Sequence, residues 1–316
     1  MDTDMINGKA MEIGIQAIGA TRCQGLSFVR EPPERLSGWR PKSAIVAIQS
    51  YRAERIETGD PLLGIVAPFA RCNYYRELRK KLEKLAKFLK SELGASCYVA
   101  SNGPVMEKPL ARMAGIGSYG LNRIIQNPVH GSRIVIGEIL TDLDLTPDDP
   151  SPELSEECRG CGKCLKACPT GALAGSGEFK RERCLQWLKQ NAGKPAWAIP
   201  IFGKTFYGCS RCQDACPANE RAAEREGYPA DPLTTVFLPE ILRLDDEGIR
   251  ERFRGLQMSA SWIPPEALVE NALIILSKSP EGRDFVKDFS RNGRPSLRET
   301  ALRLLETGPM GGTGRT

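Results

Sequence analysis

Residues 158–173 read CRGCGKCLKACPTGAL and place four cysteines at fixed spacing with a proline directly after the last one. This C-x2-C-x2-C-x3-C-P pattern is that of bacterial ferredoxins, in which three thiolates bind one iron–sulfur cluster and the fourth binds the other cluster of a pair. A second run, CSRCQDACP at 209–217, contains three more cysteines, and Cys184 lies between the two runs. The count therefore reaches eight, enough for two clusters of four ligands each.

The spacing of the two runs predicts a crossed assignment of these ligands. The last cysteine of each run, Cys168 or Cys216, precedes a proline that turns the chain away, and each is assigned to the cluster of the other run. The first [4Fe–4S] cluster then takes Cys158, Cys161, Cys164 and Cys216, and the second takes Cys168, Cys184, Cys209 and Cys212. Zinc ribbons are the alternative for C-x2-C pairs, but the three-residue gap before each C-P favours clusters.

Composition places the chain in the ordinary globular class. It has 316 residues, 41% hydrophobic and 26% charged, with a net charge of +5 spread over 44 basic and 39 acidic residues. We find neither an apolar run long enough to span a membrane nor a secretory signal, so we expect a cytoplasmic protein. The cysteines outside the two runs are expected to be buried thiols, namely Cys23, Cys72 and Cys97.

The first half of the chain alternates predicted strands and helices. Strands are expected at 43–50, 96–101 and 133–140 because these segments are short and apolar. Leucines at steps of three and four predict an amphipathic helix over 73–93, and a short helix is expected at 107–115. GIGSYG at 115–120 follows a helix and not a strand, so it is not a dinucleotide fingerprint. The single histidine, His130, is interpreted as a loop residue.

The pattern predicts a fold of class α+β or α/β in several parts. An N-terminal α/β domain is expected at 1–148, and a ferredoxin-like domain at 149–228. A helical region at 229–308 carries five predicted helices, and the Gly-rich tail at 309–316 is expected to be disordered.

Several stretches resemble the epoxyqueuosine reductases, cobalamin-dependent enzymes of tRNA modification that are related to reductive dehalogenases. The resemblance covers roughly residues 30–305. Besides the cysteine runs, it is carried by PKSAIVAIQSY (41–51), NYYRELRKKLEKLAKFL (73–89), NGPVMEKPLARMAGIGSYGLN (102–122), GSRIVIGEILTDLDL (131–145), RERCLQWL (181–188) and LPEILRLDDEGIRERFRG (238–255).

The resemblance implies an architecture and a reaction. A base-off cobalamin lies in the N-terminal domain, two [4Fe–4S] clusters lie in the second, and the C-terminal helices are HEAT-like. One cluster reduces cobalamin to the cob(I) state, which reduces an epoxide in queuosine biosynthesis while an acid supplies a proton. The implied partners are a low-potential donor of ferredoxin or flavodoxin type and tRNA, without a membrane, and we expect a monomer or weak dimer.

The implied site residues follow from the same stretches. The family's acid would stand at Ser101, so Tyr75 and Tyr119 become candidate catalytic residues beside Ser101. The candidate cobalamin contacts are Ser101, Asn102, Gly103, Tyr119 and Gly137.

Four departures from the family pattern favour a paralogue with another substrate. Ser101 replaces the acid, and a serine hydroxyl is too weakly acidic to act for it near neutral pH. Asn73 and Tyr75 stand where the family has Asp and His, and Leu121 stands where it has Lys. The stretch LQMSASWIPP at 256–265 lacks the family's basic residues, which argues against tRNA. The alternative function is a ferredoxin-like electron carrier without substrate chemistry of its own.

Overall fold

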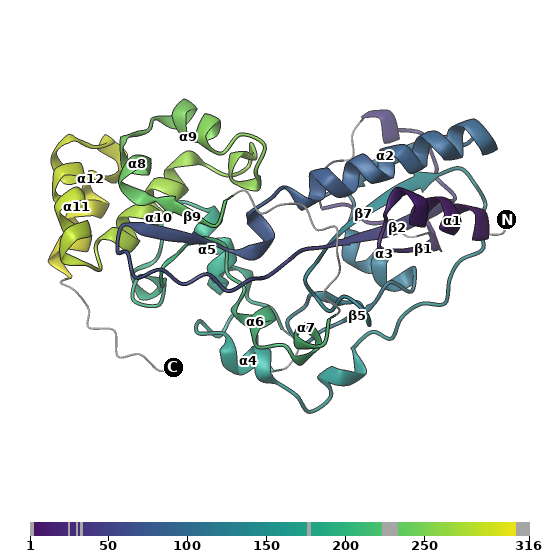
Figure 1. Ribbon diagram of the computed structural model, residues 1–316, viewed down its shortest axis with the longest axis horizontal. Coiled ribbons are helices and arrows are strands. Elements are labelled where there is room, and N and C mark those ends of the chain that lie inside the picture. The colour runs from purple at the N-terminus through teal and green to yellow at the C-terminus, as the bar shows by residue number, and fades with distance from the viewer. Residues whose placement is uncertain are drawn as a thin grey trace.

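The N-terminal half is built on a four-stranded sheet. The computed structural model (Figure 1) describes residues 3–24, 26–29, 31, 34–175, 178–222 and 233–307. The strand order is β1-β2-β7-β4, and every neighbouring pair is antiparallel. The sheet therefore gives this half an α+β character, and its strands are β1 (Ala17–Arg22), β2 (Ser43–Ser50), β4 (Cys97–Ser101) and β7 (Ile134–Thr141).

Helices cover both faces of this sheet, so β2 and β7 are buried along their whole length. Side chains alternate along β7: Val135 and Ile139 pack with the leucines of α2 (Tyr74–Leu93), while Ile136 and Leu140 pack on the side of α3 (Glu107–Met113). Helix α1 (Asp4–Ile13) packs beside α2. The predictions of β2, β4, β7, α2 and α3 are confirmed to within about two residues.

One strand leaves this half of the molecule. Strand β3 (Leu63–Val66) pairs in parallel with β8 (Thr205–Tyr207) and antiparallel with β9 (Thr235–Phe237). In Figure 1 the dark-blue chain crosses over to the side of the C-terminal helices. The predicted N-terminal unit 1–148 thus contributes a strand to the other half, because Val66 and Ala70 belong to the same apolar core as the C-terminal helices.

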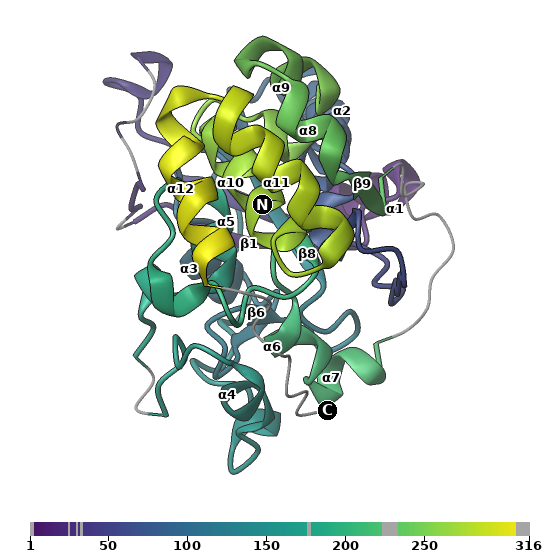
Figure 2. The same ribbon diagram turned by 90° about the vertical axis from the view of Figure 1, so that its left-hand side faces the viewer.

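The cysteine-rich region has little regular structure. Its helices have four to six residues, namely α4 (Lys163–Ala167), α5 (Leu185–Gln190), α6 (Arg211–Asp214) and α7 (Pro217–Glu220). Helices α4, α6 and α7 gather at one edge of the molecule in both views (Figures 1 and 2). The hairpin of β5 (Ser118–Tyr119) and β6 (Ile125–Gln126) packs against this region.

Short 3-10 turns connect the elements at several places along the described chain. They are Glu34–Leu36, Pro68–Ala70, Glu156–Cys158, Arg181–Arg183, Ala196–Ala198 and Gln257–Ser259.

Among the described residues, five helices form the C-terminal part, as predicted; they lie together at one end of the molecule in Figure 1 and face the viewer in Figure 2. They are α8 (Leu238–Arg243), α9 (Asp246–Arg252), α10 (Pro265–Leu276), α11 (Pro280–Asn292) and α12 (Pro295–Glu306). Helix α10 is central, because every residue from Ala267 to Leu276 is buried. The predicted boundary at 228/229 and the tail at 309–316 lie outside the described residues.

Within the part of the chain that the structure describes, no helix combines the length and the apolar character that crossing a membrane requires.

Candidate functional site

Two cavities divide the eight cysteines of the motifs into two sets. The smaller cavity has a volume of about 320 Å³, and the larger one has a volume of about 470 Å³. Set one lines the smaller cavity and consists of Cys158, Cys161, Cys164 and Cys216. Set two lines the larger cavity, here named the central cavity, and consists of Cys168, Cys184, Cys209 and Cys212. The chain brings together the same groups of four that the crossed assignment predicts.

Turn geometry makes this division possible. Gly160 and Gly162 adopt positive φ angles of 73° and 62°, which are costly for other residues, and thereby fold the first run back round its cavity. Helix α4 then carries the chain away before Cys168, which reaches the other cavity. Cys216 belongs to the second run but lines the cavity of set one. It lies directly before Pro217, the first residue of α7. Each run therefore serves both cavities.

The thiols within a set lie close enough to affect one another. Burial raises the pKa of Cys164, and the neighbouring Cys158 and Cys216 add to the effect. Burial likewise raises the pKa of Cys212 to about 12, with Cys209 and Cys184 as the next causes. A group of four thiolates that are buried or partly buried is therefore stable only around positive charge, and a metal cluster supplies that charge.

The arrangement does not match a zinc ribbon. Among the described residues, no three side chains of His, Cys, Asp or Glu converge on a point where a single ion could bind. Four ligands of one zinc ion must all lie about 2.3 Å from that ion. A cluster with four separate irons binds each thiolate at a different iron, so the four cysteines of a set do not have to converge on one point.

Polar side chains lie beside the sulfurs of both sets. In set one, Gln126 of β6 donates from Nε2 to Cys216 Sγ over 3.4 Å, and its Oε1 lies 3.7 Å from Cys158 Sγ. In set two, the Thr170 hydroxyl lies 3.5 Å from Cys168 Sγ. Burial tends to raise the pKa of Cys168, but hydrogen bonds from Thr170 and nearby backbone N–H groups lower it overall. Such contacts to sulfur tune a cluster's reduction potential.

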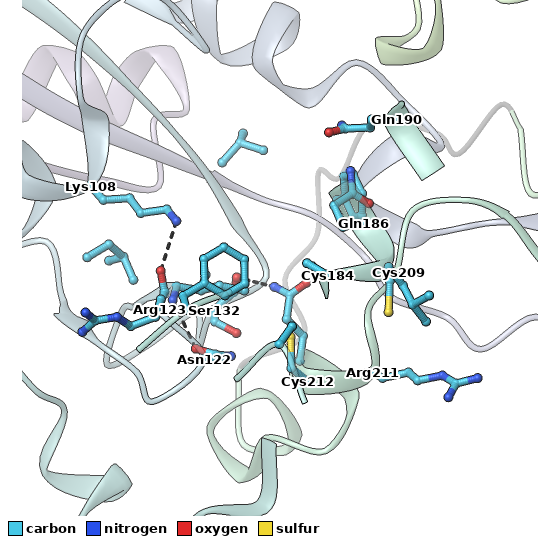
Figure 3. Close-up of a pocket in the computed structure, with 18 of the residues that line it drawn as sticks. Lys108, Asn122, Arg123, Ser132, Cys184, Gln186, Gln190, Cys209, Arg211 and Cys212 are labelled. Atoms are coloured by element: carbon cyan, nitrogen blue, oxygen red, sulfur yellow. Dashed lines mark hydrogen bonds between the residues drawn. The ribbon is translucent and has the colours of Figure 1, made fainter. Parts of the chain in front are cut away.

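The wall of the central cavity opposite set two comes from the N-terminal half. Figure 3 shows Lys108, Asn122 and Arg123 on one side of the cavity and Cys184, Gln186 and Cys209 on the other. Lys108 Nζ donates to the Arg123 carbonyl over 3.0 Å. Two buried atoms in this lining, Asn122 Nδ2 and Gln186 Oε1, have no hydrogen-bond partner among the described residues. Buried polar atoms are normally paired, so the cavity is suited to a polar ligand.

Two of the predicted non-cysteine site residues line this cavity, and four do not. Tyr75 and Asn102 are in its wall. Ser101 and Gly137 are paired across β4 and β7 on the face that α2 covers, where Ser101 Oγ donates to the Ile136 carbonyl over 3.0 Å. A Cβ at Gly137 would lie only 2.8 Å from Leu82 Cδ1, so that glycine serves helix packing.

Gly103 and Tyr119 are the other two residues that do not line the cavity. Tyr119 is half-buried in the β5 hairpin, and its backbone is hydrogen-bonded to Glu153 and Ser155. The sequence alone could not place them, because the orientation of the loops around them depends on tertiary packing.

Sequence reasoning missed part of the wall, including Glu107, Lys108, Asn122 and Gln186. Glu107, Lys108 and Asn122 lie inside the stretch 102–122 that carries part of the family resemblance, and this stretch was the signal available in the sequence. The stretch that lacks the expected basic residues also contributes, through Gln257, Trp262 and Ile263. The segment 256–265, which lacks the basic residues expected from the resemblance, therefore forms an uncharged part of the cavity wall.

The remaining cysteines and the histidine lie elsewhere. Cys23, Cys72 and Cys97 line neither of the two cysteine cavities. Cys23 is buried as predicted, and burial raises its pKa to about 12, whereas Cys72 and Cys97 are only partly buried. His130 is buried in the loop between β6 and β7, where its backbone N–H donates to Asn127 Oδ1.

Comparison with known proteins agrees with this geometry. Residues 157–219 match the family model described as the 4Fe-4S double cluster binding domain. The chain is 32% identical over 252 residues to the epoxyqueuosine reductase of Bacillus cereus, an alignment that covers 77% of this chain and 64% of that protein. The chain thus spans less than two thirds of the length of this relative. The Listeria monocytogenes epoxyqueuosine reductase is 28% identical, with 92% of this chain and 85% of that protein aligned.

Solved structures of epoxyqueuosine reductases share the fold. One, in complex with an epoxyqueuosine-modified tRNA-Tyr stem loop, superposes with a TM-score of 0.82 at 25% identity, covering 96% of this chain and 89% of that one. The structure of the Bacillus subtilis enzyme with its catalytic aspartate loop swung out of the active site gives a TM-score of 0.80 at 26% identity, with the same coverage.

Proposed function

We propose that the chain, which belongs to the epoxyqueuosine reductase family, is an iron–sulfur oxidoreductase. In this proposal its two [4Fe–4S] clusters pass single electrons to a cobalamin in the central cavity. One observation carries this proposal: set two and the polar wall from the N-terminal half line the same cavity. An electron that reaches set two is therefore delivered directly to whatever that cavity binds.

We also infer the direction in which electrons flow between the two cysteine sets. We assign the first cluster to set one and the second to set two. Three charged residues, Glu157, Lys163 and Arg221, line the cavity of set one, so we place the entry of electrons there. A low-potential carrier of ferredoxin or flavodoxin type would serve as donor. Set two then acts as the electron donor to the central cavity.

The lining of the central cavity fits a cobalamin. The corrin ring carries amide groups round its edge, and these can pair with the unpartnered Asn122 Nδ2 and Gln186 Oε1. The rings of Tyr75 and Tyr51 and the side chain of Phe69 supply apolar surface in the same wall. When bound, cobalamin supplies a strongly reducing cobalt centre. The chain's residues hold the cofactor against set two and exclude water from it.

We propose that the substrate carries an electrophilic group such as an epoxide and differs from the epoxyqueuosine stem loop in its other contacts. Two features support this. Ser101 stands in place of the family's acid, and it is not among the residues that line the cavity. The wall at Gln257, Trp262 and Ile263 lacks the positive charge that an RNA backbone would require. The second candidate function, an electron carrier without its own substrate, is favoured only by the first of these features.

An anaerobic reconstitution tests the proposal. The protein is loaded with iron and sulfide, hydroxocobalamin is added, and bound cofactors are counted after gel filtration. We expect about eight irons, four for each cluster, together with about one cobalamin per chain. The loaded protein is then given a low-potential donor and an epoxyqueuosine-modified tRNA stem loop, and the nucleosides are analysed by mass spectrometry.

The outcomes separate the candidates. Bound cobalamin that the donor reduces, without turnover of the stem loop, supports a reductase of another substrate. Turnover of the stem loop at the rate of a Bacillus subtilis control would show epoxyqueuosine itself to be the substrate. Iron without cobalamin would overturn the reductase and leave the electron carrier.

A further inference from the structure

A glutamine from the N-terminal half contacts two cysteines of set one. Gln126 of β6 lines the smaller cavity and is buried, with an exposed fraction of 7%. Its Nε2 donates to Cys216 Sγ over 3.4 Å, and its Oε1 accepts from the Cys158 thiol over 3.7 Å. These two cysteines belong to different runs, so one amide group contacts both runs of the cysteine region.

The GIGSYG stretch at 115–120 makes room for this amide. Strand β5 pairs with β6 so that Ser118 lies opposite Gln126. A Cβ at Gly117 would lie only 2.2 Å from the Gln126 carbonyl oxygen, and a Cβ at Gly120 would lie 2.6 Å from Gln126 Nε2. Gly120 is not among the glycines with a positive φ angle, so what it provides is space. The stretch that lacks the context of a dinucleotide fingerprint therefore shapes the hairpin that presents Gln126 to set one.

The second run is fixed to the chain that follows this hairpin. Asn219 of α7 accepts the Ser132 backbone N–H over 2.7 Å and donates to the Gln213 carbonyl over 2.7 Å. Gln213 Nε2 in turn donates to the Ser132 carbonyl over 2.7 Å. All three residues are buried. Because α7 begins directly after Cys216, these bonds hold that cysteine at a defined position relative to β6.

The donor group of the Gln126 amide acts on a bound cluster more than its acceptor group does. Cysteines bind metal as thiolates. The Cys158 sulfur then has no proton to donate to Oε1, whereas the Nε2 donor to Cys216 meets a negatively charged acceptor, so its hydrogen bond becomes stronger. The charged side chains that line the same cavity are exposed, so water and salt screen them. The Gln126 N–H, by contrast, is buried beside the sulfur.

We propose that Gln126 raises the reduction potential of the first cluster. This inference rests on the clusters of the proposed function and is independent of its cobalamin and its substrate. One electron passes from the low-potential donor to the oxidised cluster, and no covalent bond is broken and no proton is taken up. The reduced cluster carries one more negative charge, so the Nε2 donor stabilises the reduced form more than the oxidised form. The first cluster therefore accepts electrons more readily than it would without Gln126.

Redox titrations of proteins with a single cluster test this role. Cys209→Ala removes a ligand of set two and leaves the first cluster, whereas Cys161→Ala leaves the second. The reduced cluster is followed by its electron paramagnetic resonance signal. In the Cys209→Ala protein, Gln126→Leu should lower the ratio of reduced to oxidised cluster at a fixed solution potential by about three- to tenfold, where tenfold equals about 59 mV for a one-electron couple. In the Cys161→Ala protein, the matched control, Gln126→Leu should leave the ratio unchanged.

Gly120→Ala gives an independent variant. Its Cβ takes the space of Gln126 Nε2 without removing the amide, so it should lower the same ratio. The double variant Gln126→Leu/Gly120→Ala should show no further fall beyond Gln126→Leu, because both changes act through one hydrogen bond. Gln126→Glu replaces the donor with a second oxygen and should lower the ratio at least as far as Gln126→Leu. An iron content of about four per chain shows that each single-cluster protein holds its cluster.

The outcomes separate this inference from the proposed function. An unchanged ratio in Gln126→Leu, or an equal fall in both single-cluster proteins, would overturn the role of Gln126. If Gln126→Leu holds no iron, Gly120→Ala decides in the same way. If a single-cluster protein loses all its iron, the titration of the full chain should show the shift in one of its two reduction steps, and a shift in both or in neither would overturn the role.

The cobalamin test is read separately. The expected shift in a chain that binds no cobalamin would overturn the reductase and leave the role of Gln126 established. A full chain that takes up no iron would overturn both.

Discussion

The two cysteine runs and the C-terminal helices are ordered by different forces. Apart from its cysteines, the run at 158–173 buries only two apolar side chains, Ala172 and Leu173, and neither belongs to an apolar core. In α10, by contrast, ten consecutive side chains from Ala267 to Leu276 are buried, and most of them belong to one core. The comparison teaches that the first region depends on its ligands for order, whereas the second depends on burial of its own side chains.

A polar joint connects the two regions. Glu270 of α10 accepts the backbone N–H groups of Gly193 and Lys194 over 2.8 and 2.9 Å, and it pairs with Lys194 Nζ over 3.1 Å. Asn271 donates to the carbonyls of Lys189 and Phe206. The segment after α5 is thereby attached to the helical core, so the position of Cys184 at the start of α5 depends on the fold of the C-terminal part.

Removing one ligand should have the largest effect. In Cys216→Ala we expect iron to fall from about eight to about four per chain, because one [4Fe–4S] cluster loses a corner. Hydrogen exchange should then accelerate strongly in 158–164 and not in α10. Cys97→Ala, a cysteine outside both sets, is the control. If hydrogen exchange accelerated equally in 158–164 and in α10, the order of the cysteine run and the order of the helical core would not be independent of one another.

Truncation in the helical core should have the next largest effect. Leu273 is 0% exposed in the middle of α10, so Leu273→Ala should lower the free energy of unfolding by about 2–5 kcal/mol. Chemical denaturation followed by circular dichroism measures this change. Iron content at low denaturant should stay that of the wild type; a proportional loss of iron would mean that the cysteine runs share the core's stability.

The smallest effect is expected at the polar joint, where the Lys194–Glu270 pair should make the free energy of unfolding depend on pH. Burial is the first cause that lowers the pKa of Lys194, to about 8, against the raising effect of Glu270. Between about pH 8 and its ordinary value of 10.5, the unfolded chain holds a proton that the folded chain has lost. Stability should therefore rise with pH in this window, by up to about 1.4 kcal/mol per pH unit from this residue.

The variant Lys194→Met isolates that contribution. Its unfolding free energy, measured at several pH values from 7 to 10.5, should lack this rise relative to the wild type. Parallel pH curves for the two proteins would contradict a buried ammonium at the joint.

Local patterns predicted much of the fold. The leucines of α2, the apolar runs of β2 and β7 and the five C-terminal helices follow from periodicity, because each element buries one side or all of its surface. The crossing of β3 could not be predicted in this way, since its four residues pair with strands about 140 and 170 positions later.

The sequence by itself determined the cysteine spacing, and that spacing predicted eight ligands in a crossed grouping, the same two groups of four that line the two cavities. It also determined the amphipathic helices. Only the tertiary structure decided which residues face the central cavity. Ser101 and Gly137 turned out to face α2, while Asn102, Glu107 and Asn122 reached the cavity wall. The reason is that a side chain's direction depends on strand pairing and loop path, which distant parts of the chain fix together.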